Sequence, residues 1–328
     1  MDELLFSLNI VLPLLLLALC GFFLKKFSVL PDSFYQSAEK LVFKVALPCS
    51  LFLNVYDAKP EETFDARLII FCVAGIAVTF FIPCIIVPIF IKDNAARGAF
   101  IQGVYRSNFA ILGLPIAERL FAESGKSVVG SLMPFTIPLF NIFAVTILSI
   151  FAPSDKKLSA LQIAKKSVIG IITNPLIIGI ALALPFMLLG WTLPSPITAT
   201  VDYLGKTATP LALLCLGASM CREKKSEKSE TDSSHHSKLS TALCAAVIRV
   251  AVIPAVVVAA AILLGFTGVQ LGVIFILFGA PTAVSSYIMA KNMKSDYELA
   301  GKILLLSTAL CSVTVFIGIY LLKTFSLI

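Results

Sequence analysis

The sequence predicts an all-α membrane protein of ten transmembrane helices, built as an inverted repeat of five helices plus five. The chain of 328 residues is 58% hydrophobic and only 14% charged, a balance far from that of soluble globular proteins. Its apolar residues come in runs of about 20, the length that crosses a bilayer. Two of these runs contain the same pattern, Gly-x-Pro-x-Ala, at residues 113–117 and 279–283. Paired interruptions of this kind indicate the binding site of a secondary transporter.

The expected spans are joined by mostly short loops, and the exception is the polar segment 221–238. This segment is predicted to be a solvated loop, and it holds both histidines, His235 and His236, for which we favour a solvated pair over a metal site. The acidic start of the chain lacks the basic residues of a secretory signal, so the first run is expected to remain as a membrane helix. The ten spans are predicted at residues 4–24, 36–56, 67–91, 98–122, 127–152, 166–189, 196–220, 239–264, 268–292 and 299–322.

Lysine and arginine are distributed unequally between the two sides of the predicted membrane. Loops that follow odd-numbered spans carry 16 of these residues and the other side carries 5. Because positive loops stay in the cytoplasm, both termini are expected outside, in a multi-pass protein of the cell membrane. The net charge of +7 is spread over short loops, which argues against a nucleic-acid partner. The eight cysteines lie mostly in apolar runs without metal-ligand spacing, so we expect no disulfide, metal centre or cofactor.

Internal similarity divides the chain into two halves. A shift of 162 positions (206 − 44) places Lys44 on Lys206, and a shift of 166 (279 − 113) places residues 113–117 on 279–283. Five is an odd number of spans, so the second half begins on the opposite side of the membrane and the repeat is inverted. Proline frees backbone groups that lipid cannot satisfy, so both Gly-x-Pro motifs are expected to interrupt their helices. The predicted boundaries are 1–152 for the first repeat, 153–165 for a short cytoplasmic linker and 166–328 for the second repeat.

The patterns that accompany catalysis are missing from the sequence. Both histidines lie in the polar loop, and the chain has neither a His-Glu-x-x-His zinc site nor a Gly-x-Ser-x-Gly elbow. Residues 125–127 and 205–207 imitate the end of a phosphate-binding loop but lack its first glycine. An intramembrane hydrolase would need a general base that the spans do not offer. The sequence therefore indicates a protein that is not an enzyme and that uses a gradient or forms a passive pore.

Polar residues near the two interruptions form the candidate substrate site. A charge inside a span is costly, so Arg106 either serves an anion or extends to the cytoplasmic interface. Asn108 offers amide donors and an acceptor. Helices that restart after a break present free N–H groups and a positive dipole end, which suit an anion. The predicted substrate-binding residues are Asn108, Arg106, Gly113, Pro115, Gly279, Pro281, Thr282, Ser285 and Ser286.

Further charges lie deeper in the spans, and two readings of them stay open. Lys44 and Lys206 occupy mirrored depths, where each either extends to the nearer interface or adds positive charge to the pathway. Asp202 lies four residues before Lys206 on the same helix face, where it can neutralise that lysine or share a proton with it. We assign these three residues to charge and coupling. For the side chains of Asn141 and Asn174 we favour contacts between helices over contacts with a ligand. Arg249 either bonds to a buried carbonyl group or reaches a cavity, and the sequence does not decide between the two.

The motifs together resemble the auxin efflux carrier family of permeases, which includes bacterial malonate and malate carriers. The resemblance extends over essentially the whole chain. In this sequence, Arg106-Ser-Asn108 followed by Gly113-Leu-Pro115 resembles the family's fourth helix. Lys206 through Pro210, with Leu216-Gly217, resembles its seventh helix. Gly279-Ala-Pro281 followed by Ala290-Lys291, and then Ser307-Thr308, resemble its ninth and tenth helices.

The resemblance implies a fold like that of the bile acid–sodium symporters. Spans 1, 2, 6 and 7 would form a scaffold, and spans 3–5 and 8–10 a transport domain in which broken helices 4 and 9 cross at the substrate. It also implies elevator-like alternation, a homodimer, and organic anions as cargo held at Asn108 and at the crossing of Pro115 and Pro281. The short linker resembles compact bacterial members, which argues against auxin itself.

The resulting prediction is a secondary active transporter of a small carboxylate, embedded in membrane lipid and coupled to protons or sodium. Two alternatives remain: a sodium-coupled carrier of amphipathic anions and a passive anion channel.

Overall fold

The computed structural model describes residues 2–57, 65–152, 168–169, 172–221 and 232–328, and its regular structure over these residues is helical. The first half contains α1 (Asp2–Lys26), α2 (Asp32–Leu41), the π-helical turn η1 (Val42–Ala46), α3 (Leu47–Tyr56), α4 (Ala66–Phe90), α5 (Asn94–Tyr105) and α6 (Phe109–Ile150). The second half contains α8 (Pro175–Leu189), α9 (Ser195–Lys206), α10 (Ala208–Met220), α11 (Asp232–Val247), the π-helical turn η2 (Ile248–Val252), α12 (Ile253–Leu263), α13 (Gly268–Gly279), α14 (Ser285–Asn292) and α15 (Tyr297–Thr324).

Several helices begin at a side chain that caps their free N–H groups. The carboxylates of Asp65, Asp93 and Asp296 accept from amides in the first turns of α4, α5 and α15. The amide oxygen of Asn174 accepts from Leu176 N at the start of α8. Such caps satisfy donors that have no partner inside the helix, and they fix where these apolar segments begin.

By length and composition, four of the described helical segments are able to cross a membrane: Ala66–Phe90, Pro115–Ile150, Lys238–Leu263 and Tyr297–Thr324. Other predicted spans consist of shorter pieces. The span expected at 98–122 consists of α5 and the start of α6, and that at 268–292 consists of α13 and α14. The span expected at 196–220 consists of α9 and α10 with Thr207 between them. The molecule is thus an all-helical membrane protein whose helices are often interrupted.

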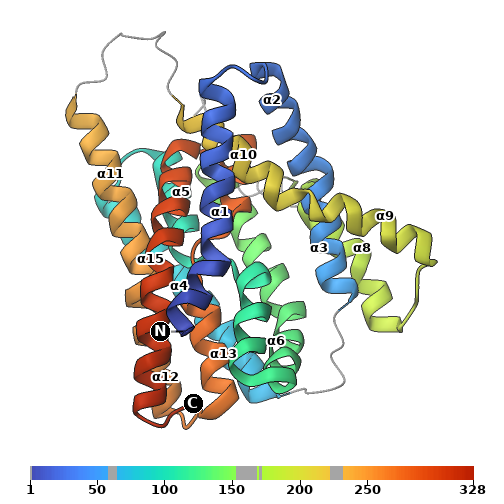
Figure 1. Ribbon diagram of the computed structural model, residues 1–328, viewed down its shortest axis with the longest axis vertical. Helices are drawn as coiled ribbons and strands as arrows, with labels where there is room; N and C mark the ends of the chain where they lie inside the picture. The colour runs from blue at the N-terminus through green and yellow to red at the C-terminus, as the bar shows by residue number, and fades with distance from the viewer. Residues whose placement is uncertain (1, 58–64, 153–167, 170–171, 222–231) are drawn as a thin grey trace.

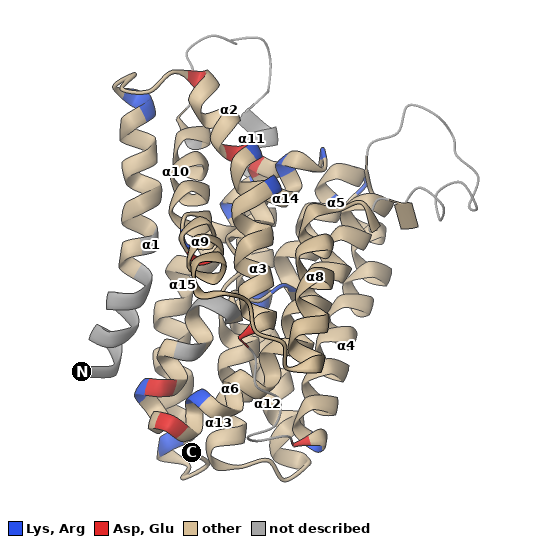
Figure 2. Ribbon diagram, turned by 90° about the vertical axis from the view of Figure 1, so that its right-hand side faces the viewer, with Lys and Arg blue, Asp and Glu red and all other residues tan. Residues whose placement is uncertain are grey.

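The helices pack as two groups that lie side by side (Figure 1). In the first group α1 packs on α10, and α3 packs on α8 and α9. In the second group α11 packs on α15, α13 packs on α6 and α12, and α4 packs on α5. Charged residues gather mainly toward the two ends of the helices, while most of the middle carries none (Figure 2). This distribution is the one expected of a protein whose middle lies in hydrocarbon.

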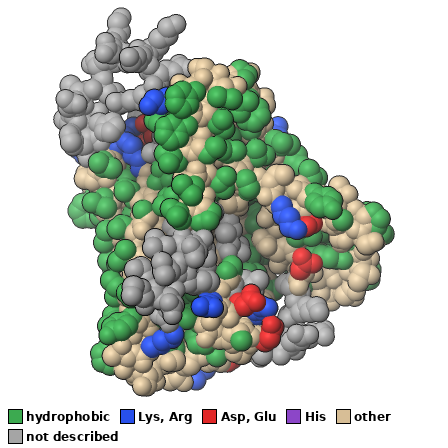
Figure 3. Space-filling view, viewed as in Figure 1, with side chains coloured by type: hydrophobic (Ala, Val, Ile, Leu, Met, Phe, Trp, Pro, Cys, Tyr) green, Lys and Arg blue, Asp and Glu red, His purple; other side chains and the backbone are tan. Residues whose placement is uncertain are grey.

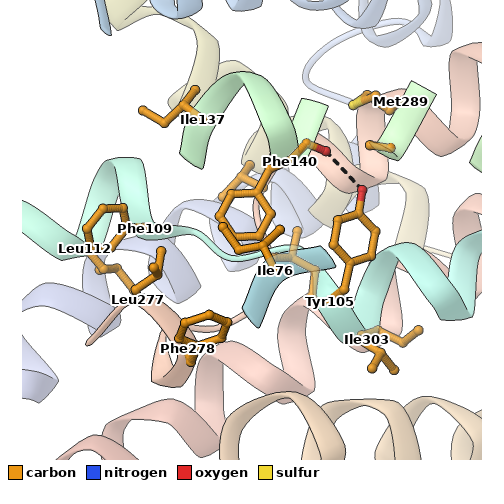
Figure 4. Close-up of a cluster of buried hydrophobic side chains, with 14 of the residues drawn as sticks. Ile76, Tyr105, Phe109, Leu112, Ile137, Phe140, Leu277, Phe278, Met289 and Ile303 are labelled. Carbon is orange, nitrogen blue, oxygen red and sulfur yellow. Dashed lines mark hydrogen bonds between the residues drawn. The ribbon is translucent and has the colours of Figure 1, made fainter. Parts of the chain in front are cut away.

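Large apolar side chains are exposed as well as buried. The upper half of the face in Figure 3 is mostly hydrophobic. On α4, the side chains of Ile70, Ile85 and Ile89 are each about 70% exposed, which suits contact with lipid. Inside, aromatic and aliphatic side chains fill the space around the end of α5, where the Tyr105 hydroxyl donates to the carbonyl oxygen of Phe140 at 2.9 Å (Figure 4). The backbone of α6 is non-helical at Ala122, with φ 52°, which divides this helix into two parts. The bond ties α5 to the second part of α6, which follows Ala122.

The first interruption does not lie where the sequence predicted it. Gly113 and Pro115 both lie within α6, and the backbone leaves the helix earlier, at residues 106–108. The second break lies as predicted, because α13 ends at Gly279 and Pro281 belongs to the extended segment that follows. A break is stable where its freed backbone groups find partners, and proline alone does not supply them. The polar loop predicted at 221–238 is also shorter than expected, because α11 begins at Asp232.

Candidate functional site

The two interrupted segments meet in the interior of the protein. Ser107 and Thr282 form an isolated antiparallel bridge between the two extended segments. The backbone N–H of Asn108 donates to the carbonyl oxygen of Pro281 at 2.8 Å. The ends of α5 and α13 and the beginnings of α6 and α14 therefore converge at one place, which we call the crossing (residues 103–109 and 277–285).

Two hydroxyl groups join the crossing reciprocally. The Ser107 hydroxyl donates to the carbonyl oxygen of Leu277 at 2.6 Å, and the Thr282 hydroxyl donates to the carbonyl oxygen of Gly103 at 2.6 Å. Each hydroxyl thus satisfies a carbonyl in the last turn of the opposite broken helix. The amide of Thr282 in turn donates to the Ser307 hydroxyl of α15 at 3.2 Å. Because all three side chains are buried, these bonds supply partners that water cannot reach.

A cavity of about 120 Å³ adjoins the crossing. Its walls come from α3, α10 and the second part of α6, and its remaining wall is the crossing itself. Arg106 is the only ionisable side chain among the described residues that line it. The lining residues are Leu47, Ser50, Leu51, Asn54, Arg106, Ser107, Asn108, Phe109, Ile137, Phe140, Asn141, Ala208, Thr209, Ala212, Ala283, Val284 and Ser285.

Arg106 follows the last residue of α5 as its C-cap and is buried, with 3% of its surface exposed. One guanidinium nitrogen donates to the Asn141 amide oxygen at 2.6 Å, and another contacts the Met289 sulfur. The Asn141 amide nitrogen donates to the Ile137 carbonyl oxygen, which orients its oxygen toward the arginine. Neither partner of Arg106 carries a negative charge. Because Arg106 is buried, it does not extend to the cytoplasmic interface, and its role toward an anion stays a prediction.

Two helix beginnings also face the cavity. Phe109 begins α6 and Asn108 precedes it as its N-cap, while Ser285 begins α14, and all three line the cavity. The first N–H groups of a helix have no partner within it, and that end carries a partial positive charge. The Asn108 side chain makes no capping bond to α6. The side-chain amide of Asn108 therefore remains available at the cavity wall, beside the charge of Arg106.

The remaining predicted substrate residues separate into three sets. Ser285 lines the cavity, while Thr282 and Pro281 do not line it and bond across the crossing. Ser286 does not line the cavity either. It is buried, and its hydroxyl has no hydrogen-bond partner among the described residues. Three others lie outside the lining: Gly113 and Pro115 within α6, and Gly279 at the end of α13.

The residues assigned to charge and coupling lie away from the cavity. Lys44 is exposed on η1, and Lys206 is exposed at the end of α9, where it pairs with Asp202. None of the three lines the cavity. The side chains of His235 and His236 fall outside the described residues.

Sequence reasoning gave too little weight to two residues. Asn141 joins α6 to the end of α5 through Arg106, as expected of a helix–helix contact, and it also lines the cavity, which was not expected. Arg249 was left open, and it bonds to three carbonyl oxygens of the crossing. Their partners lie between 28 and 144 positions away in the chain, so no local spacing pairs these residues. A buried polar group within an apolar run was the one signal present.

Comparison with known proteins gives two matches. A family profile described as "Membrane transport protein" matches residues 6–319, nearly the whole chain. An uncharacterized transporter of Methanocaldococcus jannaschii is 23% identical over 319 residues, which cover 92% of this chain and 94% of that relative.

Proposed function

The chain belongs to the membrane transport protein family, that of the auxin efflux carriers, and from this premise we propose that it carries a small organic anion, a carboxylate, by secondary active transport. It is a multi-pass membrane transporter, and its family is one of transporters rather than enzymes. The proposal concerns the cargo, the mechanism and the residues that hold the cargo.

One observation carries the proposal. The cavity at the crossing is positive, because its lining contains Arg106 and no acidic residue among those described, and because α6 and α14 begin at it. A carboxylate placed there would contact the Arg106 guanidinium, the side-chain amide of Asn108 and the positive ends of two helices. At about 120 Å³ the cavity is smaller than the roughly 300–1,000 Å³ of drug-sized sites. Its size favours an acid of a few carbons over large amphipathic anions.

The ten-span inverted repeat is supported by the pattern of bonds at the crossing. The two carbonyl acceptors, Gly103 and Leu277, are 174 positions apart (277 − 103), and the bridged Ser107 and Thr282 are 175 apart (282 − 107). In this region the two halves of the chain therefore correspond at a separation of 174–175 positions. The sequence comparison had used a separation of 166, which paired Gly113 with Gly279. The two groups of packed helices fit a scaffold and a transport domain, which an elevator mechanism would move against each other. A homodimer and a location in the cell membrane complete the proposal.

The test is uptake of labelled carboxylates of two to four carbons into proteoliposomes, with thermal unfolding in the same acids. A ligand at a hundred times its Kd adds about 2.7 kcal/mol of stability. Asn108→Ala should lose both uptake and stabilisation. The matched control is Asn292→Ala, because the Asn292 amide bonds to its own helix outside the cavity.

Two results would contradict the proposal. If no carboxylate stabilises the wild-type protein or is taken up, the cargo is not a small acid. If uptake shows no acceleration by unlabelled acid on the opposite side, the protein is a channel and not a carrier. Uptake of large amphipathic anions in preference to small acids would favour the sodium-coupled alternative.

A further inference from the structure

Arg249 is a fully buried cation next to the crossing and outside the cavity lining. It lies in η2, the π-helical turn between α11 and α12. A π-turn inserts a residue into a helix, changes the direction of the side chains that follow, and often accompanies a functional site. No ion pair of Arg249 occurs among the described residues. The question is therefore what compensates its charge.

Three carbonyl oxygens from the two broken helices compensate it. The Arg249 Nε donates to Ala280 O at 2.9 Å, and the two terminal nitrogens donate to Tyr105 O and Leu277 O, each at 3.2 Å. Tyr105 is the last residue of α5, and Leu277 and Ala280 lie at the end of α13. A single guanidinium thus joins the C-terminal ends of both broken helices.

The charges balance at this point. A helix C-terminus carries roughly half a negative elementary charge, because its last carbonyl groups have no partner in the helix. Two such ends meet at Arg249, so their sum is about equal and opposite to one guanidinium. In carriers driven by an ion gradient, the carbonyl groups of unwound helices and the C-terminal ends of half-helices are where the coupling cation binds. Here a side chain holds those carbonyl groups.

We propose that Arg249 is the resident cation of the crossing, so that the crossing is complete without a bound metal cation and carriage of the cargo does not require sodium there. Arg249 acts through the two helix ends and does not contact the cargo, so it is a positioning residue. Only the transport measurements of this proposal rest on the proposed function; the stability measurements need no cargo.

The first measurement uses the wild-type protein. Its unfolding temperature, and its rate of carboxylate uptake, should be the same in sodium, potassium and N-methylglucamine salts of equal ionic strength. A stability that rises selectively with sodium overturns the proposal whatever the cargo is. Uptake that needs sodium also overturns it, while leaving the anion-carrier function intact. If no carboxylate is carried, the stability comparison still decides.

The second measurement removes the cation. Arg249→Ala should lower the unfolding temperature and reduce uptake at least about tenfold, because buried carbonyl groups lose their donors. Guanidinium or methylguanidinium at millimolar concentration should restore part of both, and N-methylglucamine should not. Arg249→Lys should be intermediate, because an ammonium group does not reproduce the planar fork.

Arg97→Ala is the matched control. Arg97 also donates to carbonyl oxygens, those of Ile91 and Pro88 at the end of α4, but it lies outside the crossing. Its loss should not make uptake dependent on guanidinium. An Arg249→Ala protein with wild-type stability and uptake, or one that guanidinium restores no better than N-methylglucamine does, would refute the role of Arg249. If Arg249→Ala does not fold, the comparison of sodium, potassium and N-methylglucamine salts on the wild-type protein tests the proposal.

Discussion

At the scale of single residues, Arg106 is the side chain on which we expect recognition of the proposed anion to depend. Its guanidinium lies at the cavity between Asn141 and Met289, neither of which is charged. A hydrogen bond to a charged group contributes about 1.5–3 kcal/mol. Arg106→Gln should therefore weaken binding of carboxylates by roughly ten- to a hundredfold, as measured by competition in the uptake assay. Arg106→Lys should fall between this variant and the wild-type protein, because it keeps the charge but not the fork.

Lys44→Gln is the control for Arg106, because it removes a positive charge that is exposed and outside the cavity lining. Its apparent affinity for carboxylates should stay within about twofold of the wild-type value, as expected for a screened surface charge. If Arg106→Gln and Lys44→Gln lower the affinity for carboxylates equally, the overall positive charge of the protein attracts the cargo, and Arg106 does not bind it directly. That result would favour the pathway role considered for Lys44 and Lys206.

Single residues also show how far the sequence could be used to predict the site. That Arg106 and Asn108 lie at a cavity was predictable, since polar groups inside apolar runs are costly unless they serve a site. The position of Asn141 was not, because its partner Arg106 lies 35 positions earlier on a different helix. Arg249 could not be assigned either, since its three acceptors are backbone oxygens, which every residue possesses. Side-chain identity carries no information about such acceptors.

At the scale of helices, small residues set how closely α1 and α10 approach. A Cβ atom added at Gly217 would lie 1.7 Å from the carbonyl oxygen of Ala18, and one added at Gly21 would lie 2.1 Å from that of Leu214. Backbones that approach this closely are typical of membrane helix pairs with small residues at the contact. Gly217→Val should force the helices apart and destabilise the protein by about 1–3 kcal/mol, the usual cost of overpacking. Thermal unfolding in detergent measures the effect.

Gly130→Ala is the matched control, because nothing lies within 4 Å of a Cβ atom added at that position of α6. It should be neutral, or stabilise by up to about 1 kcal/mol through helix propensity. Equal unfolding temperatures for the wild-type protein and Gly217→Val would mean that α1 and α10 adjust freely. Their close contact would then not be a determinant of the fold.

The helices themselves were predictable to a greater extent than their interruptions. Apolar runs and capping residues specify most helix positions through local sequence. The break at 106–108 depends on distant partners, since Asn108 pairs with Pro281 and Ser107 with Leu277. Pro115 was the stronger local signal for a break, yet α6 continues through it. Sequence patterns locate the residues that permit a break, and tertiary contacts decide which of them is used.

At the scale of the whole molecule, orientation in the membrane follows from the loops. The N- and C-terminal ends both lie in the lower half of Figure 1, and the connection from α1 to α2 lies at the top. The excess of lysine and arginine, 16 against 5, predicts that the top faces the cytoplasm. A C-terminal alkaline phosphatase fusion should therefore be active in a bacterial host, and a fluorescent-protein fusion at the same end should be dark. Reversed activities would invert the orientation and the sides assigned to every loop.

An ion pair joins α2, which packs on α10 of the first group, to α14, which packs on α15 of the second group. Both helices lie toward the end that is predicted to be cytoplasmic (Figure 2). Lys291 Nζ of α14 lies 2.6 Å from Glu39 Oε1 of α2, and the Tyr287 hydroxyl donates to the same oxygen at 3.1 Å. The Glu39 side chain is 7% exposed and that of Lys291 is 30% exposed. The proposed elevator motion would separate α2 from α14. If it occurs, this pair would have to break in each cycle, and it would stabilise the conformation described here.

Breaking this pair should therefore lower stability and alter turnover together. Glu39→Gln should cost up to about 3 kcal/mol, the lower end for a buried pair, because Lys291 keeps some access to water. The charge-swapped protein, Glu39→Lys with Lys291→Glu, should recover most of the unfolding temperature. A swap less stable than either single variant would mean that Tyr287 and the packing around it hold the two groups together. Recovered stability with altered uptake would assign the pair to the alternation between states, because its energy then opposes the motion that moves the cargo.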